Sequence, residues 1–506
     1  GDLMEGISHE AMRLAGHLKL KNLIVFFDNN KISIDGSTSL SVSDNYKKRF
    51  ESYGWSFLEV NGHNEKQISK AITKASKSKK PTIISCKTII GFGSPNKSGK
   101  ASSHGSPLGD EEIALVRKKL KWNNRPFEVP QEILDEWRNI GNKGEQLENE
   151  WLETVNKKNP KIKSELNGSN DKLDLNGLEN LIRQEKDKNF ESKPSLATRQ
   201  CSMAAIEKIS AFLPELIGGS ADLSGSNNTK TNNSKIINSK NFNGNYIHYG
   251  VREHGMAAVM NGLALYGGII PYGGTFLIFS DYCKPSIRLS ALMGLKVIYV
   301  FSHDSIGLGE DGPTHQPIEQ LTGLRAIPNL NVFRPADINE TFECWEIALK
   351  SENTPSAIAL SRQKVPYINP SNSKENKCEK GAYVVNLTSH ESNVTLVASG
   401  TEVELALKVQ DKLKENNIHS KVVSMPCMEL FDKQPEDYRK DILEENSLII
   451  TLEAGSVMSW QKYIKNKGAN LGIDKFGESA PYKEVYKHFK LSEEDITNFI
   501  QKKLRE

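Results

Sequence analysis

Short apolar runs, rich in β-branched residues, recur along this chain and are followed by longer amphipathic stretches. This alternation constrains the possible folds more than any other feature. Continuous apolar runs of five or six residues are typical of parallel strands that helices cover on both faces. The sequence therefore predicts an α/β fold with parallel or mixed sheets flanked by helices. The predicted strands are 22–27, 82–86, 296–301, 394–399, 420–424 and 447–452.

The segment that begins at 394–399 shows the pattern most clearly. Gly400 and Thr401 follow the predicted strand and form a turn, and Thr401 is a residue type that caps helices. Ala406, Val409 and Leu413 are then spaced to lie on one face of a helix. A strand, a turn and a helix in this order predict one unit of a parallel α/β domain.

The length of 506 residues suggests three domains, since a domain usually has about 100–200 residues. Residues 122–195 are rich in Lys, Glu, Asn and Gln, which favours a charged helical connector. A second boundary is expected near 366–380. The predicted pieces are a first domain at 1–125, the connector at 126–194, a second domain at 195–365 and a C-terminal domain at 380–506.

Charge and cysteine usage exclude several classes of protein. The formal net charge is only +3, which gives no argument for nucleic acid binding. No apolar run reaches the roughly 18 residues that a membrane helix needs, and no leader peptide is expected at the start. The six cysteines form no CxxC pair, so we expect reduced, buried thiols and a cytoplasmic protein.

The loop at 303–317 holds the densest group of chemically active residues. It follows the predicted strand 296–301, and ligands of α/β sheets bind at the carboxyl ends of strands. The alternative is a surface loop with satisfied polar groups, but several titratable groups in one loop favour a functional site. These residues are His303, Asp304, Glu310, Asp311 and His315.

Two further stretches have a structural and a functional interpretation. Glu253 stands just before an apolar stretch, where a carboxylate at a helix start is favoured by the helix dipole. Phe276, Phe279 and Tyr282 recur every third residue, so that a helix would place them on one face. That face is either core packing or an apolar slot for a flat heteroaromatic ring.

Isolated residues elsewhere allow the same two interpretations. Asp2 and Asn30 bracket a predicted helix and strand whose outer ends meet at one sheet edge, where their oxygens suit Mg²⁺ on a diphosphate, although both are common turn residues. Arg199, Arg362 and His104 are either ordinary surface residues or phosphate ligands.

Together these clusters resemble the transketolase family nearly end to end. The matching runs include MEGISHEAMRLAGHLKLKNLIVF, SSHGSPLGDEEIAL, LPELIGGSADLSGSN, NYIHYGVREHGM, HDSIGLGEDGPTHQP and FGESAP. The resemblance implies a diphosphate-binding, a pyrimidine-binding and a C-terminal α/β domain. It also implies a homodimer in which thiamine diphosphate lies between the first domain of one subunit and the second domain of its partner.

The resemblance also implies roles for matching residues. Glu253 would hydrogen-bond the aminopyrimidine ring of the cofactor and so help to form the thiazolium ylid that attacks a ketose phosphate such as xylulose 5-phosphate. The ketol unit then passes to an aldose phosphate such as ribose 5-phosphate. The catalytic set is Glu253, His315 and His104, and cofactor contacts come from His104, Asp222, Phe276, Phe279 and Tyr282. Substrate contacts come from His104, Arg199, Ser226, His303, Asp311, His315 and Arg362, and Mg²⁺ or Ca²⁺ is bound by Asp2, Asn30 and the carbonyl of Ile32.

Two departures from the family pattern affect the first domain. The family carries a further segment ahead of Gly1 that supplies histidines and strands, so we expect unpaired strand edges and exposed apolar surface here. Leu3 follows Asp2 where the family has a second glycine and a longer spacing. We therefore expect the chain alone to bind the cofactor weakly or not at all, and Asp2 to fall short of the metal.

Two alternatives remain on the sequence alone. A related thiamine enzyme, such as a deoxyxylulose-phosphate or dihydroxyacetone synthase, would share most of these residues. A non-catalytic protein built on the same fold would be expected to lose Glu253 or His315, and both are present.

Overall fold

The computed structural model describes residues 1–158, 175–368, 373–389, 391–444, 446–464 and 468–506. It contains two compact units, which are described separately here. The first consists of Gly1–Asn167 with Asn238–Lys240, and the second of Gly168–Ile237 with Asn241–Glu506.

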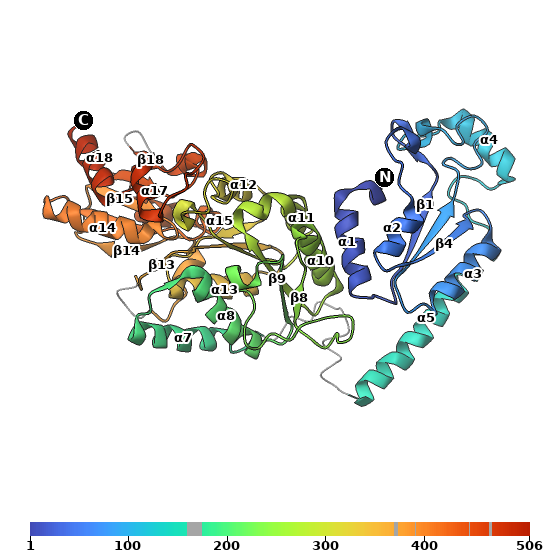
Figure 1. Ribbon diagram of the computed structural model, residues 1–506, viewed down its shortest axis with the longest axis horizontal. Coiled ribbons are helices and arrows are strands. Elements are labelled where there is room, and N and C mark those ends of the chain that lie inside the picture. The colour runs from blue at the N-terminus through green and yellow to red at the C-terminus, as the bar shows by residue number, and fades with distance from the viewer. Residues whose placement is uncertain (159–174, 369–372, 390, 445, 465–467) are drawn as a thin grey trace. The chain divides into compact units, whose positions relative to one another are not determined.

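The first unit is built on a three-stranded parallel sheet in the order β1-β5-β4 (Figure 1). Its strands are β1 (Ile24–Asn29), β4 (Ser56–Asn61) and β5 (Thr82–Lys87), and a small antiparallel pair is formed by β2 (Ile32–Ser33) and β3 (Gly36–Ser37). The helices are α1 (Gly6–His17), α2 (Tyr46–Ser52), α3 (Glu65–Ala75), α4 (Asp110–Leu120) and α5 (Gln131–Lys158).

Strand β1 differs from the expectation of a strand covered on both faces. None of its six residues is buried, and Phe26 is 51% exposed. The reason is its place at the edge of the sheet, where β5 is its only neighbouring strand among the described residues. By contrast, the central strand β5 is buried from Thr82 to Cys86. The exposed apolar surface expected for this unit is therefore confirmed.

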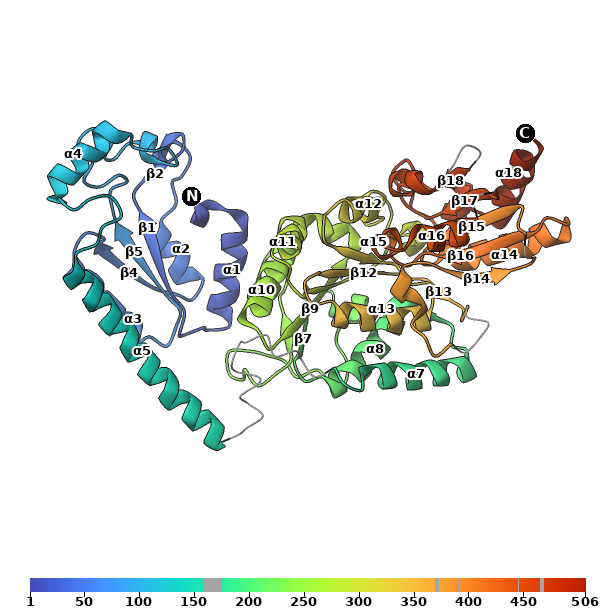
Figure 2. The same cartoon turned by 180° about the vertical axis from the view of Figure 1, so that it is seen from behind.

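The second unit contains a six-stranded, fully parallel sheet in the order β11-β12-β10-β9-β7-β8. The strands are β7 (Leu216–Ser220), β8 (Tyr246–His248), β9 (Ile270–Phe276), β10 (Ile298–Ser302), β11 (Asn331–Phe333) and β12 (Ser356–Leu360). Figure 2 shows two helix layers on the sheet, which pack separately: α10 (Glu253–Tyr266) with α11 (Ser280–Leu292), and α7 (Leu178–Ser192) and α8 (Thr198–Phe212) with α13 (Ile338–Lys350).

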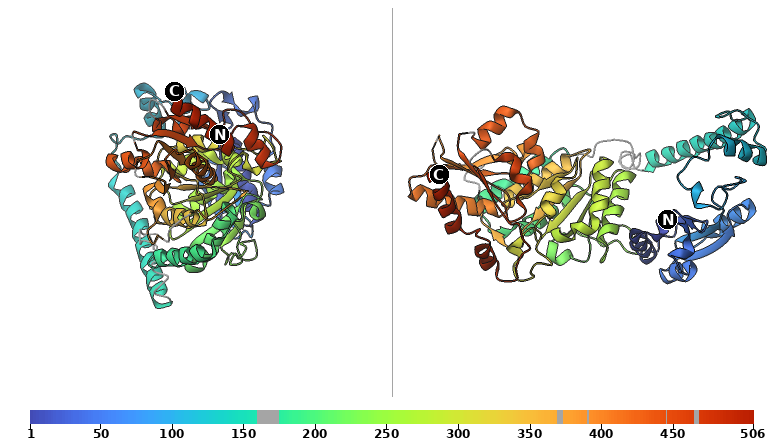
Figure 3. Two further views of the ribbon diagram at one scale, coloured as in Figure 1. Left: turned by 90° about the vertical axis from the view of Figure 1, so that its left-hand side faces the viewer. Right: turned by 90° about the horizontal axis from the view of Figure 1, so that it is seen from above.

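The same unit contains a five-stranded mixed sheet in the order β14-β16-β15-β17-β18. Only β14 (Tyr383–Leu387) is antiparallel; β15 (Val394–Ala398), β16 (Ser420–Ser424), β17 (Leu448–Leu452) and β18 (Ala469–Leu471) are parallel. Its helices include α14 (Glu402–Glu415), α15 (Met428–Asp432), α16 (Glu436–Leu443), α17 (Tyr482–His488) and α18 (Glu493–Arg505). This C-terminal part, orange to red in Figure 3, packs directly on the yellow part with β11 and β12.

One apolar cluster joins the two sheets of the second unit. It runs from Ile209 and Trp345 beside the six-stranded sheet to Val409 and Ile450 in the C-terminal part. The three residues predicted for one face of α14, including Val409, are all fully buried, which confirms that helix. The predicted parallel and mixed α/β sheets flanked by helices are thus confirmed.

Two local predictions need qualification. Thr401 occupies the N-cap position of α14 but makes no capping hydrogen bond, so that prediction is wrong. Its hydroxyl instead donates to the Glu402 carboxylate at 2.7 Å and accepts from Gln363 Nε2 at 3.3 Å. The charged connector is helical where it is described, in α5 and α7, and its residues 159–174 lie outside the described part.

Across the described residues, no helix has the length and apolarity needed to cross a membrane.

Gly16 gives a test of the packing of the first unit. A Cβ atom added there would lie 1.8 Å from the backbone carbonyl oxygen of Tyr53, so Gly16→Ala should lower the free energy of unfolding by about 1–3 kcal/mol. Gly141→Ala in α5 is the matched control, because nothing lies within 4 Å of its added Cβ. That change should raise helix stability by up to about 1 kcal/mol. Urea denaturation followed by circular dichroism measures the stability of both variants. Equal changes in the free energy of unfolding would contradict the close packing of Gly16 against Tyr53.

Candidate active site

The carboxyl ends of the parallel strands in the six-stranded sheet carry the predicted site residues. Asp222 follows β7, Phe276 ends β9, His303 follows β10 and Arg362 follows β12. Helix α10 begins at Glu253, shortly after β8, and packs on β9. Residues that are distant in sequence therefore share one edge of the sheet, where α/β proteins bind their ligands.

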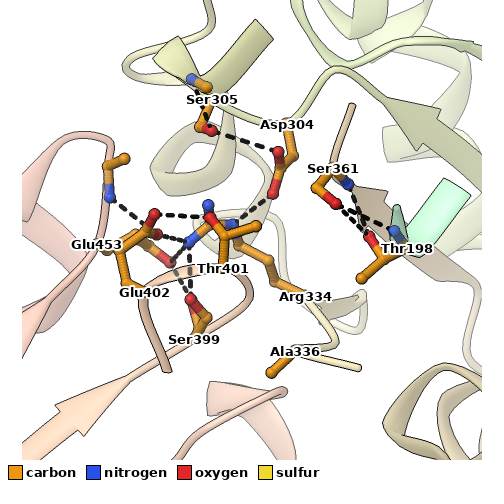
Figure 4. Close-up of polar contacts among 12 residues, drawn as sticks. Thr198, Asp304, Ser305, Arg334, Ala336, Ser361, Ser399, Thr401, Glu402 and Glu453 are labelled. Atoms are coloured by element: carbon orange, nitrogen blue, oxygen red, sulfur yellow. Dashed lines mark hydrogen bonds and ion pairs between the residues drawn. The ribbon is translucent and has the colours of Figure 1, made fainter. Parts of the chain in front are cut away.

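A short strand pair brings two of the arginines together. β6 (Leu196–Ala197) pairs antiparallel with β13 (Lys364–Val365). Next to this pair, the Thr198 backbone N–H donates to the Ser361 hydroxyl at 3.0 Å and the Ser361 N–H donates to the Thr198 hydroxyl at 2.7 Å (Figure 4). Arg199 and Arg362 are the neighbouring residues, so the pairing fixes the backbones that carry both guanidinium groups.

Arg199 and Arg362 line a cleft of about 410 Å³ with Gly307, Gln363, Lys364 and Tyr482. Arg199 Nη1 donates to the Ser226 carbonyl at 2.6 Å, and Arg362 Nη1 donates to the Leu308 carbonyl at 2.6 Å. Burial, and then the charge of Arg362, lowers the pKa of Arg199 from its ordinary value. Two guanidinium groups and the Lys364 ammonium make this cleft suitable for a phosphate group.

His303 lies beside these cations and is only 4% exposed. Its ring centroid is 3.8 Å from that of Phe276, and its Nδ1 is 2.9 Å from the Ser302 hydroxyl. Burial, and after it the nearby charges of Arg199 and Arg362, lowers the pKa of His303 to about 3. The imidazole is therefore neutral at ordinary pH and offers a hydrogen bond rather than a charge.

The aromatic residues group together, but not as one helix. Phe276 ends β9, Phe279 lies in the 3-10 turn η4 (Leu277–Phe279), and Tyr282 lies in α11, so the single helix is wrong. The strand extends to Phe276 because it pairs with β10 as far as Ser302. The rings still form a series, with centroids 5.7 Å apart for Phe276 and Phe279 and 5.9 Å for Phe279 and Tyr282. Tyr282 is 65% exposed, which argues against plain core packing.

His315 is adjacent to this aromatic series. Its ring centroid is 5.7 Å from Phe279 and 6.3 Å from Phe276, and its Nδ1 is 2.9 Å from the Thr314 hydroxyl. Asp311 lies on the exposed turn just before it. The loop 303–317 thus brings His303 and His315 to the same aromatic rings from its two ends.

The remaining predicted residues of this edge are more open to solvent. Glu253 is half-buried as the first residue of α10, and Asp222 is exposed with a left-handed backbone, φ 64°. Their places after β8 and β7 agree with a cleft at the sheet edge, but neither residue lines the arginine cleft.

In the first unit, the predicted metal ligands are mainly oxygen atoms near the sheet edge. The Asn30 side-chain oxygen accepts from the Ile32 N–H at 3.0 Å. Asp2 is exposed in the turn η1 (Asp2–Met4), and His104 is exposed after η3 (Ala101–Ser103). The described residues contain no group of three or more His, Cys, Asp or Glu side chains that would hold a metal. An amide, a carboxylate and a carbonyl are nevertheless ligand types that suit Mg²⁺.

Some residues of the site were not predicted as site residues from the sequence. Gln363, Lys364 and Tyr482 line the cleft, and Tyr482 comes from the C-terminal part, far along the chain. Gln316 Nε2 donates to the Gly309 carbonyl and to the Glu478 carbonyl, both at 2.9 Å. A larger cavity of about 680 Å³ in the first unit, which includes His63 and Phe92, contains none of the predicted residues.

Comparisons with known proteins agree with this arrangement. Residues 1–174 match the family model "Transketolase, thiamine diphosphate binding domain", residues 194–367 match "Transketolase, pyrimidine binding domain", and residues 381–492 match "Transketolase-like TK C-terminal domain". The transketolase of Sinorhizobium medicae is 47% identical over 503 residues, covering 98% of this chain and 71% of that protein. The transketolase of Cereibacter sphaeroides is 45% identical, covering 100% of this chain and 76% of that protein.

Solved structures show the same fold. Transketolase from Leishmania mexicana superposes with a TM-score of 0.91 at 37% identity, covering 99% of this chain and 74% of that one. Transketolase from Pichia stipitis in complex with sedoheptulose-7-phosphate superposes with a TM-score of 0.90 at 38% identity, covering 100% and 75%.

A parallel sheet with a cation-lined cleft at its carboxyl edge, in a chain that matches a thiamine diphosphate binding domain, defines a thiamine-diphosphate-dependent enzyme. The chain belongs to the transketolase family. By homology its activity is the transfer of a two-carbon ketol unit between sugar phosphates. The three-domain α/β architecture expected from the sequence is that of the family.

The low pKa of His303 predicts a pH effect on stability. Below pH 6.5, the ordinary pKa of histidine, the unfolded chain takes up a proton that the folded chain refuses until about pH 3. Stability should therefore fall with decreasing pH in this window, with a contribution of about 1.4 kcal/mol per pH unit, and be unaffected above it. His303→Asn should remove this contribution, since Asn tolerates a left-handed backbone.

Denaturant unfolding between pH 4 and 8 measures this slope. His419→Asn is the control, because it removes an exposed imidazole and should leave the slope of the parent protein unchanged. A parent and a His303→Asn variant with the same pH slope would show that His303 is not held neutral.

Proposed function

We propose that the edge of the six-stranded sheet binds the donor and acceptor sugar phosphates, such as xylulose 5-phosphate and ribose 5-phosphate. The observation that carries this proposal is the cleft where Arg199 and Arg362 converge beside the neutral imidazole of His303. A phosphate dianion gains charge-assisted hydrogen bonds from both guanidinium groups. The Pichia stipitis transketolase structure with bound sedoheptulose-7-phosphate supports the same ligand class.

In this proposal Ser226 and His303 complete the phosphate site. The Ser226 carbonyl already holds Arg199 in place at 2.6 Å, and His303 contributes a neutral hydrogen bond. Asp311 and His315 then face the sugar hydroxyl groups. His315 is the proton shuttle of the set, because it is the half-buried histidine next to the aromatic rings.

The exposed aromatic series and Glu253 form the proposed contacts to the cofactor. Phe276, Phe279 and Tyr282 offer an open apolar slot for a flat ring, and their partial exposure fits that use. Thiamine diphosphate, when bound, supplies an electron sink that stabilises a carbanion. Glu253 would hold a proton at a ring nitrogen of the cofactor through a charge-assisted hydrogen bond, and Asp222 would line the same cleft.

The first unit would hold the diphosphate end through His104 and a divalent cation. Asn30 and the carbonyl of Ile32 are the proposed ligands for Mg²⁺, with Ca²⁺ as the other hard cation that these oxygens suit. Asp2 is the third ligand of the family pattern, and the shortened spacing after it is expected to keep it from the metal. The expected weak cofactor binding of the chain alone stays a prediction.

We further propose the assembly and domain limits implied by the family. The protein would act as a cytoplasmic homodimer, with the cofactor shared between the first domain of one subunit and the second domain of its partner. The domain limits would be 1–125, 195–365 and 380–506, with the connector at 126–194. The exposed side chain of Tyr282 and the edge of strand β1 that is unpaired among the described residues support this proposal, because each leaves surface that a partner subunit would cover.

Arg362 tests the substrate site without any cofactor. Arg362→Ala removes one charge-assisted hydrogen bond worth about 1.5–3 kcal/mol, so the affinity for a sugar phosphate should fall about 10- to 150-fold. Calorimetric titration with ribose 5-phosphate measures this loss. Arg288→Ala, at an exposed arginine of α11, is the control and should bind as the parent does. Equal affinity of the Arg362 variant would refute the assigned site.

Glu253 tests the catalytic assignment. Glu253→Ala should leave folding unchanged and lower turnover by about 10²- to 10⁴-fold, the usual contribution of a positioned proton-transfer group. The assay follows sedoheptulose 7-phosphate formed from xylulose 5-phosphate and ribose 5-phosphate, in a protein extended by the part of its relatives that this chain does not cover. Glu191→Ala, on the exposed end of α7, should retain full turnover, and undiminished turnover of the Glu253 variant would defeat the role.

A further inference from the structure

The backbone of His303 has an unusual conformation. Its φ is 61°, in the left-handed region, although the residue is a buried non-glycine. Such a conformation persists only where the surrounding structure over-determines it. Ser302, before it, is fixed by pairing of β10 with β9 and β12. Asp304, after it, donates its N–H to the Leu360 carbonyl at 3.2 Å and accepts from Arg334 Nε at 2.9 Å.

Arg334 connects this loop to the C-terminal part of the unit. It follows β11, has no exposed side-chain surface, and contacts the Glu402 carboxylate through Nη1 (Figure 4). The same Nη1 donates to the Ser399 carbonyl at 2.9 Å and lies 3.8 Å from the Glu453 carboxylate. The Arg334 guanidinium therefore joins Asp304, next to His303, to two carboxylates of the C-terminal part: Glu402 after β15 and Glu453 after β17.

The space around Arg334 is shaped for this contact. Gly400 has φ 57°, and a Cβ atom there would meet three atoms of the Arg334 side chain at 2.9 Å. The Gly400 N–H also donates to the Arg334 carbonyl at 2.9 Å, and the Arg334 N–H donates to the Pro426 carbonyl at 2.8 Å. Backbone and side chain of Arg334 are thus both fixed by the C-terminal part.

Glu402 accepts four hydrogen bonds. Its Oε1 accepts from the hydroxyls of Thr401 and Tyr486, both at 2.7 Å. Its Oε2 accepts from the Ala454 N–H at 3.1 Å and from Arg334. A carboxylate satisfies all four partners, whereas an amide in its place could still donate to the two hydroxyls but would carry no charge to pair with the Arg334 guanidinium.

The far end of the loop is attached to the C-terminal part as well. Gln316 Nε2 donates to the Glu478 carbonyl at 2.9 Å, and the Ser479 hydroxyl donates to the Glu310 carbonyl at 2.6 Å. Residues beyond position 398 therefore hold the far part of the loop 303–317 directly and its near end through Arg334.

We propose that the C-terminal part of the unit sets the position of the His303 imidazole, with Glu402 as a positioning residue that acts through Arg334 and Asp304. That the positioned imidazole serves to bind a sugar phosphate rests on the proposed function. The positioning of the ring by Glu402 does not depend on it. A buried ion pair is often neutral for stability compared with apolar residues, so its value here is the fixed geometry of the loop.

The test measures the titration of His303 by NMR with isotope-labelled histidine in the full chain, with the signal assigned by its absence in His303→Asn. In Glu402→Gln the loop should release the imidazole towards water, so that the pKa of His303 rises by at least about 1 from its value of about 3. Loss of a nearby negative charge alone would lower that pKa, so a rise reports movement of the ring and not a simple charge effect.

Glu343→Gln is the matched control. Glu343 is equally buried in the same unit and pairs with the buried Lys186, away from the loop. This variant should be less stable but should keep the His303 titration of the parent. If Glu402→Gln does not fold, Arg334→Lys carries the same test, because a single ammonium cannot span Asp304 and Glu402 as the planar guanidinium does.

An unchanged His303 titration in the Glu402 or Arg334 variant would overturn the proposal, and so would an equal rise in Glu343→Gln. Calorimetry of the parent with ribose 5-phosphate separates this result from the proposed function. A parent that binds no sugar phosphate would refute the substrate site and leave the positioning result standing.

Discussion

The buried guanidinium of Arg334 is the interaction on which the arrangement of the second unit depends. A buried charge is tolerated only when it is paired and hydrogen-bonded, so Arg334 requires Asp304, Glu402 and Glu453 to stay together. These carboxylates come from two different sheets. Arg325 adds a second pair, with Nη1 at 2.7 Å from Glu453, between the same two parts. The sheets therefore cannot shift independently without exposing or separating these charges.

The same network separates negative from positive charge around the loop 303–317. Asp304 directs its carboxylate to Arg334 and the interior, while its neighbour His303 is neutral beside the cleft. The cleft itself is lined by Arg199, Arg362 and Lys364. The Asp304 carboxylate is thus paired inside the protein, while these cations line the cleft where an anionic sugar phosphate would bind, and the exposed Glu310 carboxylate lies 3.9 Å from Arg362 Nη1.

Local sequence patterns predicted the elements that depend on local rules. The strands 394–399, 420–424 and 447–452 agree with the structure to within one residue, because buried parallel strands need continuous apolar runs. The predictions for Phe276 and Thr401 failed, because pairing with a neighbouring strand extended β9 and because the Thr401 hydroxyl bonds the side chains of Glu402 and Gln363. In both cases a tertiary partner overrode a local preference.

The sequence by itself determined the α/β class and the family, and it predicted most of the candidate site residues, since these follow from apolar periodicity and from motifs that are continuous along the chain. Only the tertiary structure decided that His303 is buried, neutral and left-handed, and that Tyr482 reaches the cleft from the C-terminal part. The pairing of Arg334 with Glu402 was equally invisible in the sequence. Burial and ion pairing depend on which distant segments meet, and residues 68 positions apart carry no local pattern that marks them as partners.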